Sequence, residues 1–243
     1  MKDFLTDIVH HTLGTGKIDV IKVTGDDKET KIQSVSEDRT LILNAMFNEV
    51  NADFAGIFGM PNLQKLNTIL NIPEYAKDAT IELKRETRNG ASTPVGIHFE
   101  NANGDFKNDY RFMTTEVINE KLKTVTFRGA NFGITIEPTV AAIQRLKFQA
   151  QANNEEPAFI AKTEGNDLKF YFGDASTHAG NFVFQSGVTG TLTKGWAWPV
   201  TLVMSILNLQ GDKTMQFSDD GVAKITVDSG LIKYEYLLPA KTK

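Results

Sequence analysis

Histidines and acidic side chains are the residues here that could bind a metal or move a proton, and the chain has four histidines and 30 acidic residues. His10 and His11 are adjacent, so on a helix their side chains point about 100° apart and cannot share one metal; both are expected to face solvent. His98 stands in a predicted strand and is expected at the surface. His178 lies in the turn-rich stretch GDASTHAG, which no serine or cysteine nucleophile motif accompanies. The histidines therefore indicate neither a metal site nor a catalytic triad.

Other short motifs give equally weak evidence for chemistry. The stretch SDDGVAKITVD lacks the spaced oxygen ligands and the terminal Glu of a calcium loop, and Asp-Asp-Gly between strands is a common turn. The GTG at Gly14–Gly16 lacks the preceding strand and the third glycine of a dinucleotide-binding loop. Trp196 and Trp198 fall on one face of an extended run, which favours packing over base stacking. We predict no catalytic residue, no metal and no cofactor, and therefore a binding or scaffold protein that is not an enzyme.

Composition limits the remaining possibilities. The chain has 243 residues, 41% of them hydrophobic, which is enough for two cores of about 120 residues each. It has no cysteine, so disulfides and thiolate metal sites are excluded and a reducing compartment is expected. The N-terminus does not resemble a signal peptide, and no apolar run approaches the ~18 residues of a membrane helix. Because the net charge is −4, contact with nucleic acid would require a local patch or a special geometry.

The elements that would position any binding surface occur twice along the chain. A segment that begins at Thr68, TILNIPEYAKDATIEL, is similar to a second segment that begins at Ser205, SILNLQGDKTMQF. The second segment lies more than half the chain length after the first. A repeat at this distance indicates a duplicated domain. We therefore predict an α+β protein with two similar domains, residues 1–122 and 123–243, each with two helices packed on antiparallel sheets.

Apolar periodicity gives the expected helices. Residues 2–13 read as an amphipathic helix, and Pro61 and Pro138 are expected to open the next two helices. The last helix is expected within 196–210, and the connector between the domains within 114–128. The predicted apolar positions are Leu63, Leu66 and Leu70 in the first half and Ile143, Leu146 and Ala150 in the second.

Two of these helices carry a stripe of neutral hydrogen-bonding side chains opposite their apolar face, where charged residues would be usual. The stripes occupy equivalent places in the two halves and consist of Gln64, Thr68 and Asn71, and of Thr201, Ser205 and Asn208. Such a stripe indicates either an ordinary solvated face or a surface that meets something polar without strong ion pairing.

Three stretches carry a family resemblance that covers nearly the whole chain in order: DFAGIFGMPNLQKLNTILNI, FGITIEPTVAAIQRLKF and WPVTLVMSILNLQGDKTMQFSDDGVAKITVDSGLIKYEYLLPAK. They resemble segments of the DNA polymerase sliding clamps (processivity factors) of T-even-like tailed phages. The match is weakest from Asp19 to Asn48. The resemblance implies the DNA-clamp fold and a homotrimeric ring around duplex DNA that tethers the replicative polymerase, and it extends to a role in late transcription.

The resemblance also implies which residues meet the partners. Double-stranded DNA would pass through the central hole without sequence preference, and the replicative polymerase and the clamp loader would bind an apolar pocket near the connector and the C-terminus. No membrane partner is implied, and the expected location is the cytoplasm of the infected bacterial host. The DNA-facing residues would be Lys2, Lys65, Arg145 and Lys147, with Gln64, Thr68, Thr201 and Ser205 as neutral lining. The partner-binding residues would be Val117, Ile118, Leu237, Leu238 and Pro239, and alternation along the strand predicts that only one of the two leucines faces inward.

Two alternatives stay open from the residues alone. One is a two-domain structural β-protein of a virion, which would assemble without encircling DNA, although the paired amphipathic helices of each half argue against it. The other is a hydrolase that uses Asp219 and Asp220, for which adjacent residues in a turn are poor geometry.

Overall fold

The computed structural model describes residues 1–243 except 89, 123–126, 128, 175, 177 and 242–243. The chain divides into two compact units, and each is described here by itself. Unit 1 comprises Met1–Thr126 with Ser229–Tyr234, and unit 2 comprises Phe127–Asp228 with Glu235–Lys243. The mixture of helices and antiparallel sheets confirms the predicted α+β class. None of the helices in the described part of the chain is long and apolar enough to cross a membrane.

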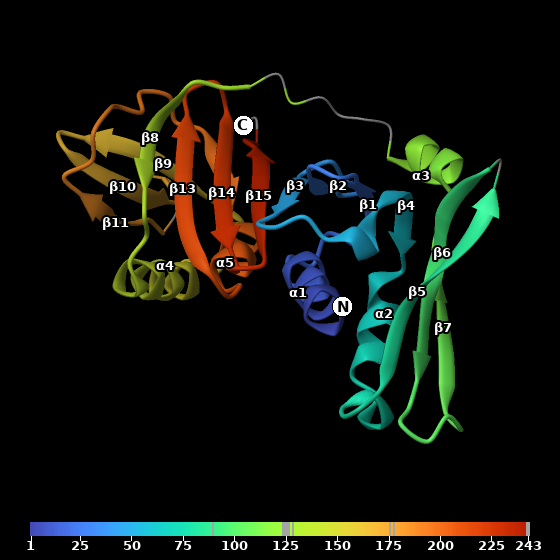
Figure 1. Ribbon diagram of the computed structural model, residues 1–243. Coiled ribbons are helices and arrows are strands. Elements are labelled where there is room, and N and C mark those ends of the chain that lie inside the picture. The colour runs from blue at the N-terminus through green and yellow to red at the C-terminus, as the bar shows by residue number, and fades with distance from the viewer. Residues whose placement is uncertain (89, 123–126, 128, 175, 177, 242–243) are drawn as a thin grey trace. The chain divides into compact units, whose positions relative to one another are not determined.

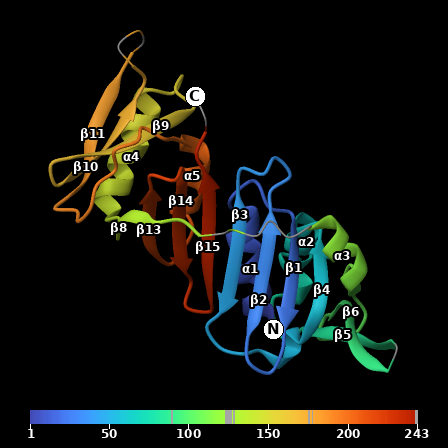
Figure 2. The same ribbon diagram turned by 90° about the horizontal axis from the view of Figure 1, so that it is seen from above.

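The described part of unit 1 contains the α-helices α1, α2 and α3 and two antiparallel sheets (Figures 1 and 2). One sheet has the strand order β4-β1-β2-β3 and the other has the order β5-β6-β7, with antiparallel neighbours. Strand β15 follows β3 in the order of the first of these sheets, and its opening residues Ile232–Tyr234 count with this unit. The elements are α1 (Lys2–Leu13), β1 (Val20–Gly25), β2 (Thr30–Val35), β3 (Ile42–Phe47), η1 (Ala52–Phe54), β4 (Gly56–Pro61), α2 (Leu63–Leu70), η2 (Pro73–Tyr75), β5 (Thr80–Arg88), β6 (Ala91–Glu100), β7 (Lys107–Arg111) and α3 (Thr115–Lys121).

Unit 2 repeats this plan. Its first sheet has the order β12-β9-β10-β11, and β13, β14 and β15 follow α5 as β5, β6 and β7 follow α2. Strand β8 precedes α4 and pairs with β13, and it has no counterpart among the described residues of unit 1. The elements are β8 (Phe132–Ile136), α4 (Val140–Ala152), β9 (Ala158–Glu164), β10 (Asp167–Phe172), β11 (Gly180–Ser186), β12 (Ala197–Pro199), α5 (Val200–Leu207), β13 (Asp212–Ser218), β14 (Val222–Asp228) and β15 (Ile232–Pro239).

The common order of helices and strands confirms the duplication that the repeated sequence predicted. Helix α1 corresponds to α4 and α2 to α5, while β1–β4 correspond to β9–β12 and β5–β7 to β13–β15. This correspondence allows any feature of one unit to be compared with its counterpart in the other.

Helix starts differ slightly from the prediction because polar caps, and not prolines, set them. Pro61 is the last residue of β4, and α2 starts at Leu63 after Asn62, whose side-chain oxygen accepts a hydrogen bond from Lys65 N at 3.0 Å. Helix α4 likewise starts two residues after Pro138, where Thr139 Oγ1 accepts from the backbone N–H of Ala142 at 3.1 Å. These side chains satisfy backbone donors that the first helical turn leaves free, so each helix begins after its cap.

Core positions follow the predicted stripes closely in α2 and less closely in α4. Leu63, Leu66 and Leu70 are buried, as predicted. In α4, Leu146 is fully buried, but Ile143 and Ala150 are only half-buried. The stripe of α4 is therefore narrower than the sequence indicated.

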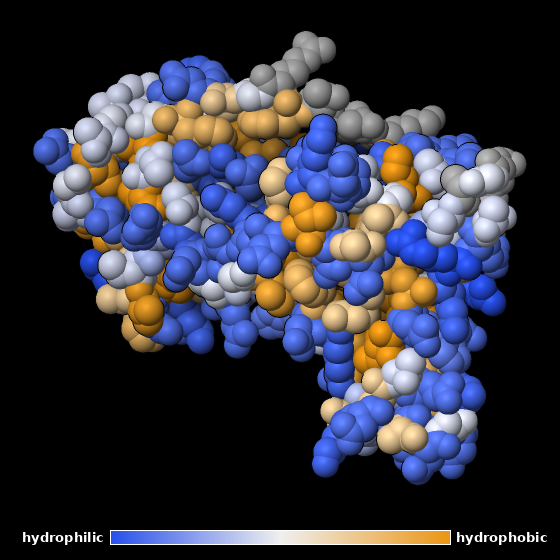
Figure 3. All heavy atoms as spheres, viewed as in Figure 1, coloured by the Kyte–Doolittle hydropathy of each residue, from blue (hydrophilic) through white to orange (hydrophobic). Residues whose placement is uncertain are grey.

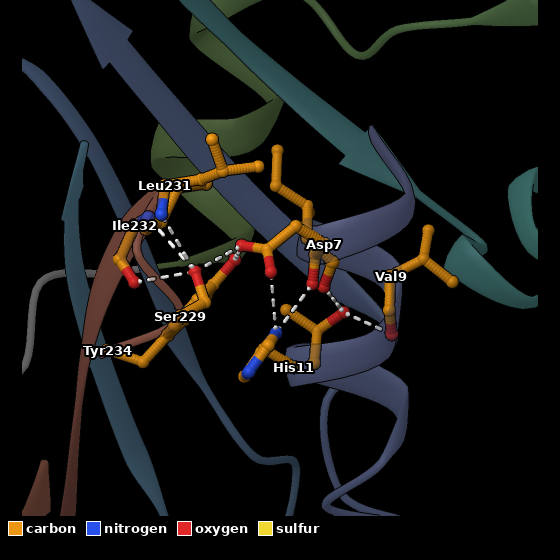
Figure 4. Close-up of polar contacts among 9 residues, drawn as sticks. Asp7, Val9, His11, Ser229, Leu231, Ile232 and Tyr234 are labelled. Atoms are coloured by element: carbon orange, nitrogen blue, oxygen red, sulfur yellow. Dashed lines mark hydrogen bonds and ion pairs between the residues drawn. The ribbon is translucent and has the colours of Figure 1, made fainter. Parts of the chain in front are cut away.

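A buried polar cluster ties α1 to the start of β15 within unit 1 (Figure 4). His11, predicted to face solvent, is instead 2% exposed and stacks on Tyr234 with ring centroids 4.4 Å apart. Its Nδ1 donates to the backbone oxygen of Asp7 at 2.9 Å and lies 3.2 Å from Asp7 Oδ1. Asp7 Oδ2 accepts from Tyr234 OH at 2.8 Å and from Ser229 Oγ at 3.0 Å. Burial alone would raise the pKa of Asp7, but the hydrogen bonds from His11, Tyr234 and Ser229 outweigh it and lower that pKa.

We expect Asp7→Asn to lower the free energy of unfolding by about 1–3 kcal/mol near neutral pH, because its NH2 group would face hydrogen-bond donors. The folded-state pKa of Asp7 lies below its ordinary 3.8, so the charge-dependent stabilisation is present above that value and is lost as the pH falls through the lowered pKa. Urea unfolding at a series of pH values from 7 downward measures this free energy of unfolding for the parent chain and the variant. The matched control is Asp3→Asn, an exposed acid on the same helix. Equal effects of the two substitutions at pH 7 would contradict the role of the cluster.

Candidate nucleic-acid interface and partner site

The exposed face of α2 is neutral apart from one cation. Gln64, Lys65, Thr68 and Asn71 are exposed, and Lys65 is the single charged residue in the sequence of this helix. Thr68 Oγ1 donates to the backbone oxygen of Gln64 at 2.9 Å, and Asn71 Nδ2 donates to that of Asn67 at 2.8 Å. Part of the hydrogen-bonding capacity of the stripe is thus used inside the helix, and the rest faces outward.

Helix α1 packs against α2 and contributes little positive charge of its own. Lys2, one of the predicted DNA-facing cations, is half-buried, and its Nζ donates to the backbone oxygen of Tyr75 at 2.6 Å. Asp3, Thr6 and His10 are exposed on this helix. The ammonium group of Lys2 therefore joins α1 to η2, which leaves Lys65 as the better placed cation of the pair.

Helix α4 carries two of the predicted cations and one exposed aromatic residue that sequence reasoning missed. Arg145 and Lys147 are exposed, and the guanidinium of Arg145 lies 5.3 Å from the ring centroid of Phe182. Phe148 is 63% exposed and Val140 is 77% exposed. Figure 3 shows hydrophobic side chains reaching the surface over this helix. The signal for Phe148 was available, because a residue two places from the buried Leu146 lies on the opposite side of a helix.

Helix α5 repeats the neutral character of α2. Thr201 and Asn208 are exposed, whereas Ser205 is half-buried and its Oγ donates to the backbone oxygen of Leu202 at 2.8 Å. The sequence of α5, VTLVMSIL, has no charged residue. The exposed residues named on α1, α2, α4 and α5 are thus mostly neutral, and the exposed cations among them are Lys65, Arg145 and Lys147.

The predicted partner-binding residues divide into exposed and buried ones. Val117 is 49% exposed and Pro239 is exposed, whereas Ile118 is fully buried and packs over Gly59. Leu237 and Leu238 are both buried, so the prediction that only one of them faces inward is wrong. Tyr236 is buried as well, because the end of β15 is covered on both faces and alternation no longer separates inside from outside.

Backbone hydrogen bonds gather the C-terminal residues and a turn of unit 2 into what we call the C-terminal seam. Ala240 N donates to Gly221 O and Lys241 N donates to Ala197 O, both at 2.8 Å. Trp196 Nε1 donates to Asp219 O at 2.8 Å, and its half-buried ring covers Gly221. The seam therefore brings Ala240 and the indole of Trp196 to the same residue, Gly221, an arrangement that the sequence did not predict.

The acidic residues of this turn serve as hydrogen-bond acceptors for neighbouring backbone. Asp219 Oδ1 accepts from Thr193 N and from Lys194 N, both at 3.1 Å, and Asp220 Oδ2 accepts from Asn131 N at 3.1 Å. Burial alone would raise the pKa of Asp219, but hydrogen bonds from the Thr193 hydroxyl and from the backbone of Thr193 and Lys194 outweigh it and lower that pKa. The two carboxylates have a structural role here, which leaves the hydrolase alternative without support from the geometry.

The remaining histidine network is also structural. His98 is half-buried, with Nδ1 2.9 Å from Asp109 Oδ1 and Nε2 3.2 Å from Glu100 Oε2, and these contacts raise its pKa. Within the described ranges, no group of three or more His, Asp or Glu side chains is arranged to hold a metal ion.

Comparison of the sequence finds no matching family model and no matching curated protein. Comparison of the structure does find similar proteins, among them PCNA structures from three organisms. A. fulgidus PCNA, in a structure with the C-terminal region of FEN-1 bound, matches with a TM-score of 0.73 and 11% identity, covering 100% of this chain and 97% of that one. PCNA from Thermococcus kodakaraensis matches with a TM-score of 0.70 and 9% identity, over 99% and 97% of the two chains. Proliferating Cellular Nuclear Antigen from Entamoeba histolytica matches with a TM-score of 0.69 and 11% identity, over 99% and 96%.

At these identities the likeness is one of fold, and it extends over both units. It agrees with the fold that the resemblance to sliding clamps implied. The chain has the DNA-clamp fold.

Proposed function

We propose that the chain is a DNA polymerase sliding clamp, a homotrimeric ring that encircles duplex DNA and tethers the replicative polymerase. The observation that carries the proposal is the repeated unit of the DNA-clamp fold, which occupies the whole chain. A tether of this kind needs no catalysis. The sequence resemblance supports a tailed phage as the source, the cytoplasm of the infected bacterium as the location and late transcription as a second process.

Strand edges indicate how copies would join. Strand β3 has β15 as its neighbour, whereas the counterparts of these strands, β11 and β7, each end a sheet. If β11 of one copy pairs with β7 of the next, these two strands become neighbours between chains, as their counterparts β3 and β15 are within one chain. Such head-to-tail contacts close into a ring, and three copies with two units each give six similar units. Pairing would also cover edges that otherwise promote aggregation.

The charge pattern suits a ring that slides. The chain has a net charge of −4 and few cations on its paired helices, so tight binding to phosphates is not expected. Encirclement retains DNA without strong contacts. Neutral hydroxyl and amide groups, with water between them and the phosphates, would allow movement along the duplex.

Polymerase and clamp loader would bind outside the hole through short peptide segments. The C-terminal seam is the best placed candidate, because Trp196 is half-buried and bonded to Asp219, while Ala240, which follows exposed Pro239, is bonded to Gly221 of the same turn. Val117 at the start of the connector is the second candidate. Apolar groups with a polar rim commonly mark peptide sites.

We expect light scattering at micromolar concentration to give the mass of three chains, with dissociation on dilution if the ring is weak.

The double substitution Asn181→Lys with Gln185→Lys adds two cations to β11. In the proposed contact these cations would oppose Lys107 and Arg111 of β7, so the mass should shift toward one chain. The matched control, Asn154→Lys with Asn166→Lys, changes exposed residues outside these strands and should leave the trimer intact. A monomer at every concentration would contradict the proposed ring.

Replacing Lys65, Arg145 and Lys147 by Glu should reduce the length of DNA made per binding event by roughly tenfold, because acidic groups would repel the phosphates. The trimer should persist. The control makes the same change of charge at Lys28, Lys162 and Lys233, which are exposed away from the four helices. Equal losses in the two triple variants would show a general charge effect and refute the assignment to the helices.

Removal of residues 239–243 should abolish stimulation of the cognate polymerase without breaking the trimer. The cut follows Leu238, because this side chain is fully buried and its loss would damage the core. A second variant, Pro239→Glu, changes one exposed side chain and should weaken stimulation in the same direction, with Pro157→Glu as the exposed control. Normal stimulation by trimeric forms of both variants would place the partner site elsewhere.

A further inference from the structure

Among the described residues, strand β5 lacks a neighbour that its counterpart β13 has. In unit 2, β13 lies between β14 and β8. In unit 1, β5 pairs with β6 on one side and ends its sheet on the other, with no further strand among the described residues (Figure 1). The duplicated fold therefore has a position beside β5 that β8 fills only in unit 2.

The two strands differ in burial at matched residues. The sequence Asp-Ala-Thr-Ile-Glu-Leu of residues 78–83 corresponds to Asp-Lys-Thr-Met-Gln-Phe of residues 212–217. Met215 and Phe217 are each 1% exposed, and they stand opposite Ile136 and Ile134 of β8. The aliphatic residues of β8 thus complete the burial of this side of the sheet.

The matching residues of β5 are incompletely covered. Ile81 and Leu83 are half-buried, although their partners on β6, Phe99 and Ile97, are 0% and 1% exposed. Contact on the β6 side is complete, so the remaining exposure is consistent with the missing strand on the other side.

The available length of the edge is also defined. The pairing of β5 with β6 shifts register between Lys84 and Arg85. Arg85 Nη2 then donates to Asp53 O at 3.1 Å and to Ala55 O at 2.8 Å, which attaches the far part of β5 to the η1 region. The part of the β5 edge that remains available for pairing is Thr80–Lys84, which has the same number of residues as β8.

We propose that the Thr80–Lys84 edge of β5 binds an extended segment of another protein as an added antiparallel strand, in the way that β8 pairs with β13. The segment would carry aliphatic or aromatic side chains at alternate positions, which cover Ile81 and Leu83 while its backbone pairs with the edge. Strand β8 defines this chemistry, since FGITI has no charged residue. A second copy of β5 fits poorly, because TIELKRETR has five charged residues among nine. The inference stands on the duplication and does not depend on the proposed function.

The probe is a peptide of the sequence NFGITIE, which matches residues 131–137, added to the isotope-labelled full-length chain. We expect NMR shifts and slowed amide exchange at residues 80–84. Leu83→Lys should weaken binding by about tenfold or more, because it removes the apolar contact. Ile57→Lys, at an exposed apolar residue of β4 in the same unit, is the control and should bind normally.

A second peptide keeps the test independent of the stability of the variant. Methylation of the backbone nitrogens of the peptide preserves its side chains but blocks strand pairing, and it should abolish binding to the unmodified protein. Absence of binding by the parent peptide, or equal binding of the methylated one, would overturn the proposal. Protection at β13 instead of β5 would also overturn it, because the peptide would then be replacing β8. Self-association lost on Leu83→Lys would assign the edge to a second copy and overturn the proposed occupant.

Discussion

The unpaired edge of a β-strand is the constraint on which this structure depends, because each exposed backbone N–H and C=O group needs a partner or water. The chain covers some of its edges locally. Gly59 of β4 exchanges two backbone hydrogen bonds with Met113, at 3.1 and 2.8 Å, and Ala197 of β12 accepts one from Lys241. Strands β7, β11 and β5 end their sheets without another strand in the described part of the chain. In the proposed ring the first two edges would join neighbouring copies, and the third would form the separate binding site proposed for β5.

Neutral helix faces complement this arrangement. A protein that held DNA through many phosphate contacts would be fixed in place and sensitive to salt. Here the cations on α2 and α4 are few, and Lys2 is engaged with Tyr75. In the proposed ring, DNA would be retained because the ring is closed, and pairing of strand edges would close it. Edge pairing and neutral helix faces would then be two parts of one proposed mechanism.

Sequence reasoning predicted what local periodicity controls. Burial of the leucines of α2 and the repeated order of elements were predictable, because apolar spacing and an internal repeat can both be read directly from the sequence. Helix starts were misplaced because the caps Asn62 and Thr139, and not the prolines, satisfy the first backbone donors.

Non-local contacts were not predictable in the same way. Burial of His11 depends on Tyr234, which is distant in sequence, and burial of both Leu237 and Leu238 depends on cover for both faces of β15. Lys65 and Lys147 are exposed, which was predictable because the polar side of a helix follows from its apolar side, and their contact with DNA stays a prediction. The C-terminal seam was missed, since its hydrogen bonds join residues from three parts of the chain.

The central claim, a closed ring around DNA, is most directly tested by covalent closure. The chain has no cysteine, so one cysteine placed in β7 and one in β11 would be the only thiols present. Oxidation of such a pair on circular DNA should give a covalent trimer that stays on the circle in high salt and leaves when the DNA is cut once. Loss from the uncut circle, or equal retention on linear DNA, would contradict the account.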